Sequence, residues 1–346
     1  MLEPERSLEH DRLRGSAVKN VGRNTVAPVL TSNFEESVNA LANGCVCADR
    51  NIGDAHRNQR RSGIQEITSL LDLKQRYRHF LASLRQRSVD VHRQELAYAT
   101  TAAEAGKLAA LFSNDSILDD KQQSNVITAS EDPESEQKQA RVEEALYEIG
   151  RYSRAYADIL KTVVTNVFIL PSSVARAGST SQAVGVIWIN PKLSYPTPDL
   201  MEMLIHEFTH QAMFLDELRF EHYSYDAIAN RSTWAKSAIL NARRPLDKVL
   251  HSIVVAIEIL LFRHRHIGQP VMPRAHPPSR IISQQLGESL SSVEDAIRRF
   301  PGILKPRAVE LVTNARNIVS HASMPSPSRR AQQVASKPKR NTEHGL

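Results

Sequence analysis

The chain of 346 residues is long enough for one large domain or two of ordinary size, and its apolar fraction of 41% is typical of a globular protein. The net charge of +6 lies mostly in the tail over residues 323–346, where five Lys and Arg residues stand against one acid. The remainder is close to neutral, which argues against specific nucleic-acid binding.

Cysteine usage and hydropathy indicate a soluble protein of the reducing cytoplasm. The two cysteines, Cys45 and Cys47, have no second pair with which to complete a tetrahedral zinc site, and the charged N-terminus lacks the apolar segment of a secretion signal. The longest apolar run, Val249 to Phe262, is interrupted by polar residues and is too short for a bilayer helix. We therefore expect no membrane partner.

The chain divides by pattern into three parts. Residues 1–62 have no sustained hydrophobic period and are expected to form a flexible N-terminal leader, and residues 323–346 a disordered basic tail. The part between them, residues 63–322, is expected to be one helical, metal-binding catalytic domain. Its first helices are predicted from Gly63 to Leu84 and from Val91 to Phe112, before an acidic loop over Ser113 to Gln139.

A small β element is predicted in the middle of this domain. After a helical stretch from Val142 to Val163, two β-branched runs read as strands, Val167 to Leu170 and Ala183 to Asn190. A strand directly before the next helix is where an extended peptide substrate would pair beside a zinc protease site. Thr197 is expected to cap that helix, with Pro198 at its first position.

The remaining elements are helices. They are predicted over Leu246 to about His266, Ile281 to Phe300 and Ile303 to His321. The fold class expected from the whole pattern is mainly α with a small β element (α+β), in which a zincin-like HExxH helix packs against a second apolar helix.

The sequence LIHEFTHQ contains the pattern H-E-x-x-H as His206, Glu207 and His210. Residues four apart share one face of a helix, so the two imidazoles can bind the same metal ion while Glu207 lies at its edge. The surrounding positions are mostly apolar, which predicts burial, and buried ionisable groups need a partner or a metal. The alternative is that both histidines are core residues bonded to backbone carbonyls.

A catalytic metal normally has a third protein ligand. His251 and Glu258 interrupt the apolar run VLHSIVVAIEILLF, and their separation of seven residues places both on one face of the second helix. Either can then complete the site from across a helix contact. Asp216 is a weaker candidate, because an uninterrupted helix carries it away from the face of His206 and His210.

The choice of third ligand bears on the chemistry. Two His and one Glu match the gluzincin zinc peptidases, in which Glu207 would be the general base for the attacking water. Two His and one carboxylate also suit a non-haem Fe(II) oxygenase, of which a set of three His would be a variant. A third possibility is a non-catalytic protein in which the metal, or a polar cluster without metal, only supports the fold.

The runs INPKLS and LIHEFTHQAMFLDEL, followed by ARRPLDKVLHSIVVAIEIL, resemble the HExxH proteins described as putative peptide-modification enzymes, some of which are 2-oxoglutarate-dependent peptide β-hydroxylases. The resemblance covers roughly residues 184–266. It implies that His206, His210 and His251 hold the metal, with Fe(II) favoured over Zn(II). It also allows Arg243 or Arg244 to bind the carboxylate of 2-oxoglutarate, although both arginines also suit a solvated helix N-terminus.

We therefore expect a metal-dependent oxygenase of the HExxH type that hydroxylates a peptide or amino-acid side chain. The alternative enzyme is a zinc metallopeptidase that uses the same residues. The sequence predicts a peptide or small-molecule substrate, and it makes no prediction of the oligomeric state.

Overall fold

The computed structural model describes residues 69–85, 90, 93, 95–99, 101–112, 126–128 and 130–321. The predicted leader and tail, both cysteines and the first part of the predicted acidic loop lie outside these residues. Helices dominate the described chain and a small sheet lies among them, so the expected class, mainly α with a small β element, is confirmed.

The first described elements are helix α3 (Leu70–Arg85), strand β1 (Ala97–Ala99) and helix α4 (Ala102–Ala109). The prediction of one helix over Val91 to Phe112 is wrong, because β1 pairs with the backbone of strand β2 (Asn166–Phe168) and gives this segment a strand conformation. Helix α4 then starts afresh, with the Thr101 side chain accepting a hydrogen bond from the Glu104 amide.

The helical stretch predicted from Val142 to Val163 is two helices, α5 (Ser135–Tyr152) and α6 (Arg154–Val163). Ser153 separates them: its extended backbone ends α5, and its side chain accepts a hydrogen bond from the amide of Tyr156. This serine therefore serves as the N-cap of α6.

The main sheet has the strand order β1-β2-β4-β3. Strand β4 (Val186–Ile189) is parallel to β2, and strand β3 (Ala177–Ser179) runs antiparallel to β4 at one edge. Both predicted strands are present as β2 and β4. The edge strand next to the HExxH helix, however, is β3, which lies in the stretch of small residues that had no predicted structure.

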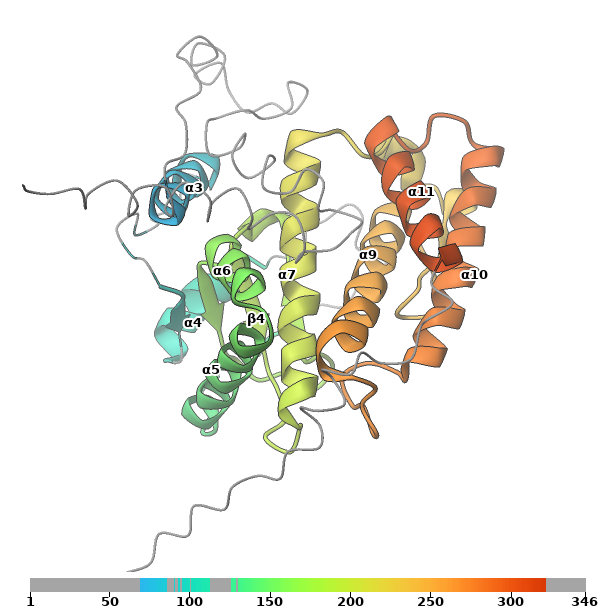
Figure 1. The fold of residues 1–346 in the computed structure, drawn as a ribbon. Helices are drawn as coiled ribbons and strands as arrows, with labels where there is room; N and C mark the ends of the chain where they lie inside the picture. Colours follow the sequence, from blue (N-terminus) through green and yellow to red (C-terminus); the bar gives the residue numbers. More distant parts are fainter. Residues whose placement is uncertain are drawn as a thin grey trace, which may run out of the picture.

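Helix α7 (Thr197–Arg219) carries the HExxH motif and runs through the middle of the molecule. Figure 1 shows the sheet, α5 and α6 on one side of α7 and the C-terminal helices on the other side. The helix starts at Thr197, but its hydroxyl donates to Glu144 instead of capping the helix, and Pro196 occupies the N-cap position. Buried side chains surround α7 on most of its circumference, as its apolar sequence predicts.

The C-terminal part begins with the short helix α8 (Tyr225–Ile228) and a hairpin of strands β5 (Ala235–Lys236) and β6 (Arg243–Arg244). Helices α9 (Leu246–Phe262), α10 (Ser279–Arg299) and α11 (Pro306–His321) follow. A π-helical turn, Arg263–Ile267, extends α9.

Helix α9 packs against α7, as the sequence predicts, and the apolar faces of both belong to the same hydrophobic core. A smaller core, centred on Phe168 and Trp188, fills the space between the sheet and α4. In the part of the chain that the structure describes, no helix is long and apolar enough to cross a membrane.

Candidate functional site

The two histidines of the HExxH motif face each other on α7. The Nε2 atoms of His206 and His210 lie 3.1 Å apart, as expected for side chains one helical turn apart. Burial, with a smaller contribution from His276, lowers the pKa of His206 to about 3, and burial also lowers the pKa of His210 well below its usual value. Both imidazoles are therefore neutral at physiological pH, which is the form that binds metal ions.

A further histidine stands at each end of this pair. The Nδ1 atom of His206 lies 2.8 Å from Nε2 of His276, and the Nδ1 atom of His210 lies 2.9 Å from Nδ1 of His251. The four rings thus form a row in the order His276, His206, His210 and His251. Burial lowers the pKa of His251 as well.

The two outer rings contact the inner rings at Nδ1, on the side away from the Nε2 pair. Among the described residues, no group of three or more His, Cys, Asp or Glu side chains is arranged to hold a metal ion. The Nε2 pair itself fits a metal, because two nitrogens bound to one zinc at roughly 2.0–2.1 Å are separated by about 3.0–3.4 Å. His206 and His210 are thus the donors that the geometry supports, and His251 is adjacent to one of them.

Glu207 lies beside the edge strand of the sheet. Its Oε2 atom accepts a 2.7 Å hydrogen bond from the hydroxyl of Ser179, at the end of β3. Burial raises the pKa of Glu207 to about 8, although the Ser179 hydrogen bond acts in the opposite direction. The carboxyl group can therefore hold or release a proton near neutral pH.

A cavity of about 170 Å³ opens at this point. Residues from α7, from the loop before α7, from the segment around β3 and from the loop before α10 line it, namely Arg176, Ala177, Tyr195, Met203, His206, Glu207, Ala275 and His276. The cavity therefore brings together one histidine of the motif, its glutamate, a tyrosine and an arginine.

Glu258 lies apart from the row of histidines. Its carboxyl group is next to the hydroxyl of Tyr156 on α6, where burial first and Glu258 second raise the pKa of that tyrosine. Residues 251 and 258 are two helical turns apart, which is roughly 10 Å along the axis of α9. The structure accordingly brings His251, and not Glu258, against the HExxH pair.

The two arginines suggested by the resemblance lie on β6, outside the lining of the cavity. Arg243 is exposed and donates to the carbonyl of Trp234, whereas the charge of Arg244 contributes to the lowered pKa of His210. The arginine that lines the cavity is Arg176. Its position just before an edge strand is not marked in the sequence, since β3 consists of the small residues AGS.

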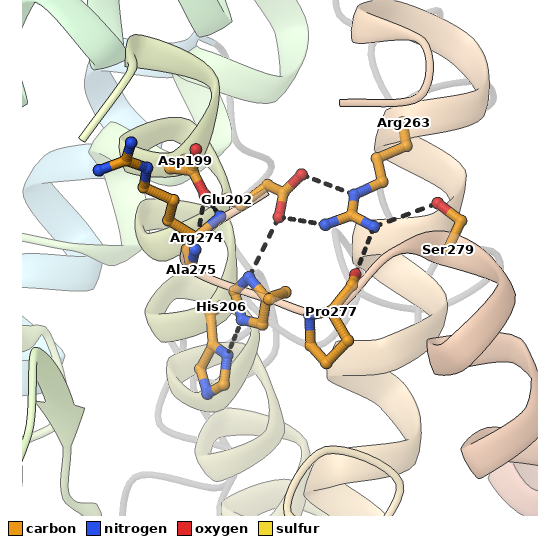
Figure 2. A network of polar contacts seen from close by, with 9 residues as sticks. Asp199, Glu202, His206, Arg263, Arg274, Ala275, Pro277 and Ser279 are labelled. Carbon is orange, nitrogen blue, oxygen red and sulfur yellow. Dashed lines mark hydrogen bonds and ion pairs between the residues drawn. The ribbon is translucent and has the colours of Figure 1, made fainter. Parts of the chain in front are cut away.

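Sequence reasoning also missed a buried network at the N-terminal end of α7 (Figure 2). The guanidinium of Arg263 binds both oxygens of Glu202, at 2.7 and 2.8 Å, and Nδ1 of His276 lies 3.1 Å from Oε2. These bonds and charges outweigh burial and hold the pKa of Glu202 below its ordinary value. The only sequence clue is that Glu202 precedes His206 by one turn.

A scan of the chain against protein-family models finds no match, and a search of curated proteins finds no significant relative. The resemblance to HExxH peptide-modifying enzymes therefore stays a prediction.

Proposed function

We propose that this protein is a metal-dependent enzyme that modifies a peptide or amino-acid substrate, with His206 and His210 as metal ligands and Glu207 beside the reacting group. The observation that carries the proposal is the Nε2 pair, 3.1 Å apart, next to a buried carboxyl group on a cavity. Neutral imidazoles and a proton-transferring carboxyl group are the parts that such chemistry requires.

The edge strand beside the cavity favours a substrate with a peptide backbone. Strand β3 forms the edge of the sheet, and its last residue, Ser179, contacts Glu207. An extended peptide that pairs with a sheet edge gains backbone hydrogen bonds and presents alternate side chains to the neighbouring site. A peptide on β3 would thus lie beside Glu207.

A metal bound by this pair would supply oxygen activation with 2-oxoglutarate if it is Fe(II), and electrophilic polarisation of a carbonyl group if it is Zn(II). Arg176, on the cavity wall, supports the first reaction, because a guanidinium group binds a carboxylate in a two-pronged arrangement. We therefore favour hydroxylation of the substrate.

Peptide hydrolysis is the second candidate, and two side chains of the cavity favour it. Glu207 can accept the proton of an attacking water, and the Tyr195 hydroxyl can donate a hydrogen bond to the oxygen that develops negative charge. Both reactions use the same pair of histidines. They differ in the metal, Fe(II) or Zn(II), and in whether they need the carboxylate of Glu207.

The test is metal analysis and activity of the full chain purified without air. We expect stoichiometric metal in the wild type, and loss of metal in His206→Ala and His210→Ala. With Fe(II), 2-oxoglutarate, added O2 and a peptide library, hydroxylation appears as gain of one oxygen in the peptide with release of succinate and CO2, whereas zinc hydrolysis appears as new peptide ends. Absence of stoichiometric metal in the wild type would contradict both, and leave the non-catalytic alternative.

Three variants address the third ligand and the role of the Glu207 carboxylate. His251→Ala should lower metal content more than Glu258→Gln, because His251 contacts His210 whereas Glu258 lies apart from the histidines. Glu207→Gln should keep its metal and abolish hydrolysis, whereas hydroxylation need not depend on that carboxylate. Wild-type metal content in the variants of both residues would exclude His251 and Glu258 as ligands.

A further inference from the structure

Residues 268–278, which we call the strap, connect the end of α9 to α10 across the N-terminal half of α7. The carboxylate of Asp199 accepts the backbone amides of Arg274 and Ala275 at 2.6 and 2.5 Å. Arg263 also binds the carbonyl of Pro277 at 2.8 Å, and Figure 2 shows these anchors around Glu202. Two hydrogen bonds thus fix the strap to α7 just before His276, and one fixes it to Arg263 just after His276.

This anchoring determines how His276 meets His206. Glu202 binds the Arg263 fork and has only acceptor oxygens as a carboxylate, so the proton shared with His276 lies on Nδ1 of that ring. With that proton on Nδ1, the Nε2 atom of His276 is the acceptor that faces Nδ1 of His206, 2.8 Å away. The proton of His206 is thereby held at Nδ1, and its Nε2 atom presents a lone pair toward His210.

We propose that His276, oriented by Glu202 and Arg263, is a positioning residue that fixes the tautomer and ring orientation of His206 for metal binding. The inference rests on the proposed function, since it assigns His206 as a ligand. Histidines bound to metals commonly donate their other ring N–H to a carboxylate, carbonyl or water. Here the imidazole of His276 takes that place. Because Glu202 holds its Nδ1 atom, its Nε2 atom is left to accept from His206.

The location of His276 separates this role from direct metal binding. Its nearest nitrogen contacts Nδ1 of His206, whereas the atom of that ring that would bind the metal is Nε2, which lies beside His210. His276 is 6% exposed. Behind it lies the buried ion pair of Arg263 and Glu202. The ring is therefore held in place behind the ligand.

The test measures Co(II) affinity of the full-length apoprotein by competition with a coloured chelator, together with the cobalt absorption band. We expect His276→Ala to weaken binding by about 10- to 100-fold, the range for loss of such a partner. His276→Gln should bind more tightly than His276→Ala, because a carboxamide oxygen can accept from His206. Circular dichroism of each apoprotein monitors folding.

His222→Ala is the matched control. His222 is also buried, and it also contacts a carboxylate of α7 that is bound by an arginine, but its carboxylate partner is Asp216. We expect this variant to lose stability while keeping wild-type cobalt affinity.

Three results would overturn the positioning role while leaving the proposed function intact. The first is wild-type cobalt affinity in His276→Ala, and the second is an equal loss of affinity in His222→Ala. The third is a loss far beyond 100-fold in His276→Ala with a changed cobalt band, which would make His276 a ligand. If the wild-type apoprotein does not bind cobalt or zinc, the proposed function fails and this inference fails with it.

Discussion

Helix α7 carries two buried networks of the same composition, one on each side of the HExxH motif. The Glu202 network consists of Glu202, Arg263 and His276, and the Asp216 network consists of Asp216, Arg307 and His222. In each, an arginine from a later helical segment binds both carboxylate oxygens, and a histidine contacts one of them. The two networks differ in what lies beyond the histidine.

In the Glu202 network the far nitrogen of His276 meets His206, and the contacts continue to His210 and His251. In the Asp216 network the far nitrogen of His222, Nδ1, is buried and has no hydrogen-bond partner in the described chain. The Asp216 network therefore joins α7 to α11. The Glu202 network, with the same kinds of side chain, holds a histidine against the candidate ligand His206. What distinguishes them is the turn of α7 on which the carboxylate lies.

The largest expected effect comes from removing Arg263. Arg263→Met leaves the carboxylate of Glu202 in a site that is 1% exposed, and loss of one partner of a buried pair costs about 3–5 kcal/mol. Arg307→Met should cost less, roughly 2–3 kcal/mol, because the arginine is closer to the surface, at 7% exposed. Urea denaturation of the two variants measures both free energies of unfolding.

A double variant, Arg263→Met with Glu202→Met, provides the control. Replacing both partners of a buried pair by apolar side chains is often close to neutral, so most of the lost stability should return. If Arg263→Met costs less than Arg307→Met, the Glu202 network is the weaker of the two and the comparison is wrong.

Acid should weaken both networks. The pKa values of Glu202 and Asp216 lie below their ordinary values, because hydrogen bonds and charges from their arginine and histidine partners outweigh burial. The stability that each contributes is present above its unfolded-state pKa, about 4, and is lost as the pH falls through the lower folded-state pKa. The free energy of unfolding should therefore fall below about pH 5.

Glu202→Gln and Asp216→Asn test this dependence, with urea denaturation between pH 7 and pH 3. Each variant should be less stable than the wild type at neutral pH and should show a shallower decline toward acid. An acid slope identical to that of the wild type in both variants would exclude these carboxylates as its source.

The smallest effect is expected at an exposed ion pair. Arg298 and Asp295 are paired on the surface of α10 with side chains 68% and 62% exposed. Solvent screens such a pair and its ordering costs side-chain entropy, so Arg298→Ala should leave the free energy of unfolding unchanged within error. A clear loss of stability there would mean that burial is not what separates the two networks from ordinary surface pairs.

The parts predicted correctly from the sequence depend on local spacing. The four-residue interval of the motif places His206 and His210 together, the apolar run of α9 predicts its packing on α7, and an unbroken helix takes Asp216 off the histidine face. Each of these follows from the helical period within one or two segments.

The parts that were missed depend on contacts between distant segments. Glu202 meets Arg263 and His276 across separations of 61 and 74 residues. Nothing in the strap sequence GQPVMPRAHPP indicates that it crosses α7. Strand β1 was predicted as helix because Ala97 to Ala99 acquires its conformation from pairing with β2. The edge strand β3 likewise owes its conformation to β4.

The continuity of α7 over 23 residues makes it intolerant of insertions. One added residue turns everything beyond it by about 100° and advances it by about 1.5 Å. An insertion between Glu202 and His206 would leave the strap attached and swing the motif away from His276, whereas one between His210 and Asp216 would move Asp216 away from Arg307 on α11. Length variation among relatives of this chain should therefore be confined to the connecting loops.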